Sequence, residues 1–178
     1  MIEMKESLAD VGWFAPFKIR LVKDRLGAAR IKWAFFAGFA AYCYGSRRKV
    51  SDIDVLVQDK DFERARQILG TIEGVELCKT KMKKIEGKEY PLGLDAEMVE
   101  HIQHRTIFGM EVNLISPEDN ILFKAILQRG KEKDKYDVED IRAMAAAEKI
   151  DQDYLRARIQ KFGATERVEK LLKKFGII

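Results

Sequence analysis

The sequence has few of the residues that mark a secreted, fibrous or disordered chain. It contains two cysteines and three prolines in 178 residues. Two cysteines are too few for a disulfide framework and are typical of a reducing compartment. We find no run of 18 apolar residues, the approximate length of a membrane-spanning helix, and no basic end and apolar stretch typical of a secretion signal. We therefore expect a cytoplasmic protein with no membrane partner.

Charged residues are abundant but nearly balanced. Lysine and arginine number 33, aspartate and glutamate number 29, and the formal net charge is +4. Apolar residues make up 47% of the chain, as in a globular protein, and a chain of this length can bury about 70% of its unfolded surface. Because so small a net charge points to no class of partner, the positions of the acids matter more than their number.

The apolar spacing predicts an α/β core followed by helices. Helical spacing or short helical turns occur at 17–29, 38–45 and 60–74, and strand-like segments at 31–37, 51–57, 75–81, 90–99 and 110–116. The strand at 51–57 alternates, which predicts that only one of its faces is buried.

The last third of the sequence reads as helices. Ser116 followed by Pro117 is typical of a helix start, and Gly130, Gly163 and Gly176 are typical stops. We therefore expect two parts, an α/β core at residues 1–116 and a C-terminal helical region at residues 117–178 packed on it.

One stretch, WAFFAGFAAYCYGSRRKVSDIDVLV, combines features that suit the binding of a metal and of phosphates. On its second strand, Asp52 and Asp54 point to the same face about 6.6 Å apart, where they repel each other unless a cation lies between them. Such oxygen ligands suit Mg²⁺. Gly38 would begin the short helix, whose N–H groups attract phosphates. The alternative without a functional site is that both acids belong to the solvent face of an amphipathic strand.

This arrangement resembles the nucleotidyltransferases of the DNA polymerase beta type. Their pattern is Gly with a second Gly or Ser, about nine to thirteen residues, and Asp-x-Asp; here Gly38-Phe39 and Asp52-Ile53-Asp54 are twelve residues apart. The residues around these motifs resemble those of small bacterial and archaeal members, the AbiEii-like and minimal nucleotidyltransferases. A later segment, ISPEDNILFKAILQRGKEKDKYDVEDI, is similar to a second motif of that group. The resemblance implies a mixed β-sheet flanked by helices and followed by a helical tail.

One position departs from the family pattern. Phe39 stands where a second small residue is usual. A small residue lets the helix N-terminus approach phosphates closely, whereas phenylalanine either blocks that approach or turns into the core. The first case favours an alternative function, a non-catalytic member of the fold that binds nucleotide or a partner protein, as one component of a toxin–antitoxin pair would.

The family has a third carboxylate on a later strand. Read as a strand, residues 90–99 present Asp95 and Glu97 on one face. The resemblance favours Asp95 as the third acid, with Glu97 as the alternative and Glu111 as a more distant one.

The resemblance also implies a reaction. Asp52, Asp54 and Asp95 would hold two Mg²⁺ ions, or Mn²⁺ in their place, and Asp95 would help remove the proton of the attacking hydroxyl. ATP or another nucleoside triphosphate would give its nucleoside monophosphate to a hydroxyl of an unidentified protein, RNA or small molecule. Residues expected to contact the nucleotide are Gly38, Phe39, Arg47, Arg48, Lys49, Ser51 and Lys124.

The most basic window, KTKMKKIEGK at residues 79–88, has two interpretations. A solvated hairpin is favoured. The alternative is a nucleic-acid-binding surface, because closely spaced lysines can follow a phosphate backbone.

Overall fold

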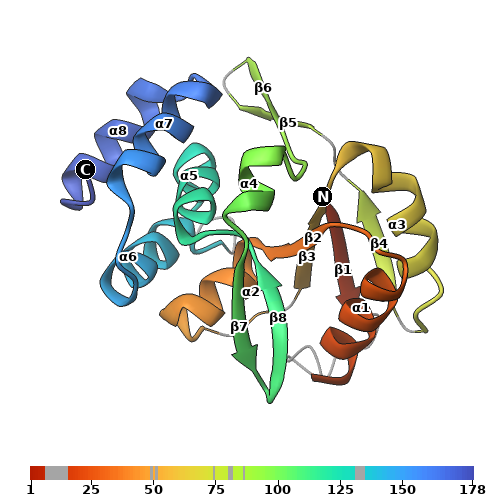
Figure 1. Cartoon of the computed structure of the whole chain (residues 1–178). Coiled ribbons are helices and arrows are strands. Elements are labelled where there is room, and N and C mark those ends of the chain that lie inside the picture. Colours follow the sequence, from red (N-terminus) through yellow and green to blue (C-terminus); the bar gives the residue numbers. More distant parts are fainter. Residues whose placement is uncertain are drawn as a thin grey trace.

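A six-stranded mixed sheet forms the centre of the protein (Figure 1). The computed structural model describes residues 1–6, 16–48, 50, 52–73, 75–79, 82–85, 87–130 and 135–178. Across the sheet the order is β4 (Val75–Lys79), β1 (Ile2–Glu6), β3 (Asp52–Val57), β2 (Trp33–Phe36), β8 (Met110–Leu114) and β7 (Gln103–Ile107). Strands β2 and β8 are parallel, and the other neighbours are antiparallel. The predicted α/β class is confirmed.

Helices surround this sheet and extend to one side of it. They are α1 (Pro16–Ala28), α2 (Ala37–Ala41), α3 (Phe62–Leu69), α4 (Ala96–Glu100), α5 (Pro117–Leu127), α6 (Asp137–Ala147), α7 (Gln152–Phe162) and α8 (Thr165–Lys174), with a π-helical turn η1 (Tyr42–Ser46) and a 3₁₀ turn η2 (Asp59–Asp61). In Figure 1, α6, α7 and α8 gather on the side of the sheet away from α1 and α3. Among the described residues, no helix is both long and apolar enough to span a membrane.

Both faces of β3 are buried, so the expectation of a half-buried strand is wrong. Ile53, Val55 and Val57 enter the larger core, which includes residues of α1 and α3. Leu56, on the opposite face, packs in a smaller cluster with Ala34, Phe36, Leu92, Leu94, Met98, Ile115 and Phe123. The alternation misleads because β3 lies between β1 and β2, and the residue 92–98 segment covers its second face.

The predicted strand at residues 90–99 is also wrong beyond Pro91. Strand β6 (Lys88–Pro91) pairs with β5 (Met82–Ile85), which confirms the predicted hairpin. The chain then forms α4, because the Asp95 carboxylate accepts a hydrogen bond from the Met98 N–H at 2.8 Å and caps the first turn. Leu92 and Leu94 imitate strand spacing, but they belong to an irregular segment.

The C-terminal helices begin and end for local reasons. Ser116 caps α5 by accepting the Asp119 N–H at 3.0 Å, as predicted. Helix α5 ends at Leu127 rather than near Gly130, because Gln128 adopts a left-handed conformation with φ of 47°. The larger core includes apolar residues of α5, α6, α7 and α8 as well as of the sheet. The helical region therefore packs against the sheet through one continuous core.

Candidate active site

A tight turn joins β2 to α2 and places Gly38 beside the acidic strand. Ala37, at the turn, has φ of 51°, a strained conformation for a residue with a side chain. Asn120 of α5 holds this turn at both ends: its Oδ1 accepts the Ala37 N–H at 3.0 Å, and its Nδ2 donates to the Ala37 carbonyl at 3.1 Å. The second sequence motif thus fixes the geometry of the first.

Asp52 and Asp54 lie at the same end of the sheet as this turn. Asp54 pairs with Phe36, the last residue of β2, in the antiparallel β2–β3 ladder. Asp54 is 8% exposed, whereas Asp52 is half-buried. Their side chains share one face of β3 because the two residues are two positions apart. The structure therefore brings Gly38, Asp52 and Asp54 together at the ends of two neighbouring strands.

Arg48 connects this place to α6. A Cβ at Gly38 would lie 3.1 Å from Arg48 Nη2, so glycine allows the guanidinium to approach the backbone. The guanidinium donates twice to Asp140, from Nε at 2.8 Å and Nη2 at 2.9 Å. Burial opposes the charge of Arg48, but the bonds to Asp140 and the nearby Asp52 keep its pKa above the ordinary value.

Lys124 is buried under the same contact. It is 3% exposed, and its Nζ lies 2.7 Å from Asp140 and 3.3 Å from Asp137. Arg129 also donates to Asp137, from Nε at 2.8 Å. Burial opposes ionisation of Asp140, but the Arg48 and Lys124 contacts outweigh it and lower its pKa. Lys124 therefore supports the Arg48 contact rather than facing solvent.

The structure places Asp95 and Glu97 in a different ion cluster. Arg158 Nη1 donates to Asp95 at 2.8 Å and to Glu97 at 2.9 Å, and Lys161 Nζ donates to both at 3.2 and 2.8 Å. Burial acts to raise the pKa of Asp95, but the Met98 N–H and the two cations hold it below its usual value. The reasoning that put these acids on a strand is therefore corrected.

Asp95 also lies away from the acidic end of β3. The Leu94 N–H donates to the carbonyl of Val57, the last residue of β3. Val57 is three residues beyond Asp54, roughly 10 Å along the strand. Within the described parts of the chain, no group of three or more His, Cys, Asp or Glu residues could hold a metal ion.

Glu111, the more distant alternative, is remote as well. Strand β8 is parallel to β2, with Leu114 beside Phe35. Glu111 is therefore level with the residue before β2, at the end of the sheet opposite to Asp54.

The remaining predicted residues fall into three groups. Phe39 is 3% exposed and turns into the core, where its ring centroid lies 4.9 Å from that of Phe35. Arg47 is exposed and follows η1 with φ of 52°. Lys49 and Ser51 lie outside the described residues.

Sequence reasoning missed a buried cluster around Arg158. This residue of α7 is 0% exposed, and its Nε donates to Asp119 at 2.7 Å. Asp119 also accepts from the Tyr154 hydroxyl at 2.7 Å and from the Ser116 hydroxyl at 3.1 Å. Burial opposes the charge of Arg158, but the neighbouring carboxylates raise its pKa above the usual value. The cluster ties α7 to α5 and, through Asp95, to α4.

A sequence motif contains some of the residues that we did not predict, whereas others lie in no recognisable motif. Asn120 and Asp140 lie within the second motif, so their presence in that pattern marked them without showing what they touch. Arg158 is one of many basic residues in a helical segment, and its partners Asp95 and Asp119 lie 63 and 39 positions away. Such distant pairing is not visible in local spacing.

The residues present suit one magnesium ion with phosphates better than a site built entirely of protein ligands. Mg²⁺ in phosphate-transfer sites is commonly bound by one or two carboxylates, with substrate phosphates and waters completing its shell. Asp52 and Asp54 supply two carboxylates on one strand face, and among the described residues no hydrogen bond or ion pair engages the Asp52 carboxylate. Their donor set therefore fits this cation.

Comparison with known proteins gives a family match for part of the chain and a similar fold. Residues 90–175 match the family model described as "Nucleotidyl transferase of unknown function (DUF2204)"; this segment begins after β3. Among solved structures, the chain is similar to an antigenic nucleotidyltransferase-like protein from Paracoccidioides brasiliensis, with a TM-score of 0.50, 17% identity, and coverage of 88% of this chain and 90% of that one. No curated protein matches the chain. Residues 90–175, just under half of the chain, are thus similar to a nucleotidyltransferase family, and the fold is similar to that of a nucleotidyltransferase-like protein.

Proposed function

We propose that the protein transfers a nucleoside monophosphate from a nucleoside triphosphate to a hydroxyl group of an acceptor. The observation that carries this proposal is the position of Asp52 and Asp54, on one face of β3, beside the Asn120-clamped turn that contains Gly38. Two carboxylates next to a turn that holds a glycine suit a metal-bound triphosphate. The family match of residues 90–175 and the nucleotidyltransferase-like fold support the same class of reaction.

Asp52 and Asp54 would be the ligands of Mg²⁺, or of Mn²⁺ in its place. The bound cation would neutralise charge on the triphosphate and on the oxygens between which the phosphoryl group moves. With Asp95 held by Arg158 and Lys161, we assign the metal to two carboxylates. A second metal ion would take more of its ligands from substrate oxygens than from the protein.

Arg48 and Arg47 would contact the phosphates of the nucleoside triphosphate. The Arg48 guanidinium already lies against Gly38, and Arg47 is exposed beside it in sequence. Asp140 orients Arg48, and Lys124 in turn lies against Asp140, so both act as positioning residues. The inward packing of Phe39 supports a catalytic protein over the non-catalytic alternative, because its ring lies in the core.

The reaction balances as an in-line displacement. The acceptor hydroxyl gives its proton to solvent water as its oxygen forms a bond to the α-phosphorus. The bond between the α-phosphorus and the bridging oxygen breaks, and pyrophosphate leaves with the electron pair. Positioning and charge neutralisation supply most of the rate in such transfers.

A label-transfer assay tests this function. The protein is incubated with each α-labelled nucleoside triphosphate, Mg²⁺ or Mn²⁺, and pools of RNA, protein and small-molecule acceptors. The Asp52→Asn/Asp54→Asn variant should lose at least about 100-fold of the transfer rate, as expected when charge stabilisation is removed. Asp59→Asn/Asp61→Asn is a matched control, because these acids have the same spacing on the η2 turn. Equal transfer by the wild type and the first variant would overturn the proposal.

A further inference from the structure

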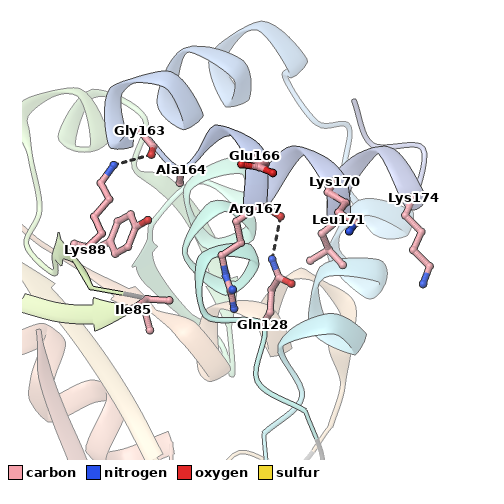
Figure 2. A pocket seen from close by; sticks show the side chains of 11 residues that line it. Ile85, Lys88, Gln128, Gly163, Ala164, Glu166, Arg167, Lys170, Leu171 and Lys174 are labelled. Atoms are coloured by element: carbon pink, nitrogen blue, oxygen red, sulfur yellow. Dashed lines mark hydrogen bonds between the residues drawn. The ribbon is translucent and has the colours of Figure 1, made fainter.

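A basic groove lies between the β5–β6 hairpin and α8 (Figure 2). Its volume is about 700 Å³, within the range of small-molecule and single-nucleotide pockets. Its lining residues come from β5, β6, the end of α5 and one side of α8 along its length. The basic residues among them are Lys88, Arg167, Lys170 and Lys174. Distant parts of the sequence thus form one surface.

Positive charge dominates this groove. Four of its lining residues are basic, and one, Glu166, is acidic. Lys170 and Lys174 are exposed and four positions apart on α8, so they lie on the same helix face. Figure 2 shows both lysines on the groove side of α8. The charge pattern is complementary to a chain of phosphates.

Several contacts fix the walls of the groove. Lys88 Nζ donates to the Gly163 carbonyl at 2.6 Å, which ties β6 to the end of α7. Gln128 Nε2 donates to the Arg167 carbonyl at 3.1 Å, and Arg167 Nε donates to the Ile126 carbonyl at 2.9 Å. These bonds anchor α8 to α5. The groove is therefore formed before a ligand arrives, which lowers the entropic cost of binding.

Apolar groups complete the lining. Ile85 and Leu171 lie on opposite walls, and Tyr90 is buried against the Lys88 ammonium, 5.4 Å from its ring centroid. Binding sites for single-stranded nucleic acids combine a basic track with apolar or aromatic surface for bases. A groove for a small inorganic anion would not need this apolar surface.

The groove is also linked to the acidic face of the sheet. From Lys88 the chain runs through β6 to Leu92 and Leu94, which pack in the cluster that contains Leu56 and Phe36. Leu56 is two residues from Asp54 on the same face of β3, and Phe36 pairs with Asp54. The segment from the groove meets β3 at the Leu94–Val57 bond, roughly 10 Å along the strand from Asp54, so a bound strand must extend beyond the groove to reach the candidate active site.

We infer that this groove binds the backbone of a single-stranded nucleic acid, which is the acceptor of the transferred nucleotide. The acceptor role rests on the proposed function, whereas the binding role stands on the groove itself. The sugar hydroxyls of such a strand supply the attacking group.

The binding role is tested without nucleotide and without divalent metal. Fluorescence anisotropy measures the affinity of the full chain for a labelled 12-nucleotide single-stranded RNA and the matching DNA across a salt series. Lys170→Gln/Lys174→Gln should weaken binding about tenfold at moderate salt and reduce the slope of log affinity against log salt by about 1.4, since each phosphate contact on a single strand contributes about 0.7. Lys23→Gln/Arg64→Gln, on α1 and α3, removes the same charge and should change neither value.

Four outcomes would overturn parts of this inference. Wild-type protein that fails to bind the strand at low salt, or a Lys170/Lys174 variant that binds like the Lys23/Arg64 variant, would contradict the binding role. Equal affinity for a poly-glutamate peptide of the same charge would assign the groove to an acidic protein instead. A strand that binds through the groove but accepts no label from any nucleotide would contradict the acceptor role.

The Asp52→Asn/Asp54→Asn variant separates the two proposals. It should bind the strand as tightly as the wild type while transferring no label. Loss of strand binding in this variant would contradict the placement of the strand in the groove.

Discussion

The Asp52 carboxylate of β3 differs from Asp119 of α5 and Asp140 of α6 in the groups that lie against it. Asp119 and Asp140 are both 0% exposed, and guanidinium nitrogens lie 2.7 Å from Asp119 and 2.8 Å from Asp140. Asp52 is half-buried and, within the described residues, its carboxylate has no ion pair or hydrogen bond. A buried acid with matched cations stabilises the fold, whereas a half-buried carboxylate at the end of a strand is the kind of group that we propose binds a ligand.

One helical acid nevertheless contacts the candidate site formed at β3, because Asp140 holds Arg48 against Gly38. The other, Asp119, holds Arg158, which binds Asp95 at the start of α4 in a separate cluster. Acids of the same chemical type therefore have different tasks, and their partners distinguish them. The following experiments test that division.

Removal of Arg158 should give the largest loss of stability. Arg158→Met leaves Asp119 buried without its guanidinium, and breaking a buried pair in this way commonly costs about 3–5 kcal/mol. The free energy of unfolding from urea titration measures it. Arg156→Met is the matched control, since Arg156 is exposed on the same helix, and should change stability by less than about 0.5 kcal/mol. A loss below about 1 kcal/mol for Arg158→Met would contradict a structural role for this cluster.

Asp140→Asn should cost less, about 2 kcal/mol at neutral pH, because Lys124 keeps Asp137 as a partner. The pKa of Asp140 is lowered in the folded protein. Its ionised form therefore stabilises the fold above the unfolded pKa of about 3.9, and this contribution is lost as the pH falls through the folded pKa. Urea titrations from pH 7 to pH 2.5 should show the difference between wild type and variant shrinking with acid. A difference that grows with acid would reverse the assigned direction.

Gly163→Ala should destabilise the protein by about 1–2 kcal/mol. Gly163 has φ of 57°, and a Cβ there would collide with Lys88 Nζ. Gly27→Ala provides the contrast, because Gly27 lies in α1 with no atom within 4 Å of the place a Cβ would take, and alanine favours a helix by about 0.5–1 kcal/mol. The two melting temperatures should move in opposite directions. A shift of both in the same direction would contradict the left-handed backbone conformation of Gly163.

The smallest effect is expected at the turn of the candidate site. Ala37→Gly removes a side chain from a residue with φ of 51° and should raise stability by about 0.5 kcal/mol. Ala146→Gly, at an exposed position of α6, should instead lower stability by about 1 kcal/mol. Chemical denaturation of both variants measures the contrast. Equal losses would show that the Asn120-clamped turn stores no strain.

Sequence patterns located the acidic strand well because local rules decide it. Gly38, Asp52 and Asp54 follow from a glycine, a loop length and a period of two, and the ladder places Asp54 opposite Phe36. The β5–β6 hairpin and the Ser116 cap follow from equally local rules.

The third carboxylate could not be found in this way. Leu92 and Leu94 have the spacing of a strand, but Asp95 caps a helix whose position depends on Arg158, 63 residues away. Asn120 contacts the β2–α2 turn across 83 residues. Pairings at such distances are set by tertiary packing, and a single sequence with local periodicity contains no record of them.

The most direct measurement compares the rate of label transfer for two pairs of acids. Asp52→Asn/Asp54→Asn should lower the rate at least about 100-fold, while Asp95→Asn/Glu97→Gln, confirmed as folded by circular dichroism, should remain within about tenfold of the wild type. That result would separate the carboxylates of the candidate site from those that hold α4 to α7. Loss of transfer in the Asp95/Glu97 variant with retention in the Asp52/Asp54 variant would contradict the central claim.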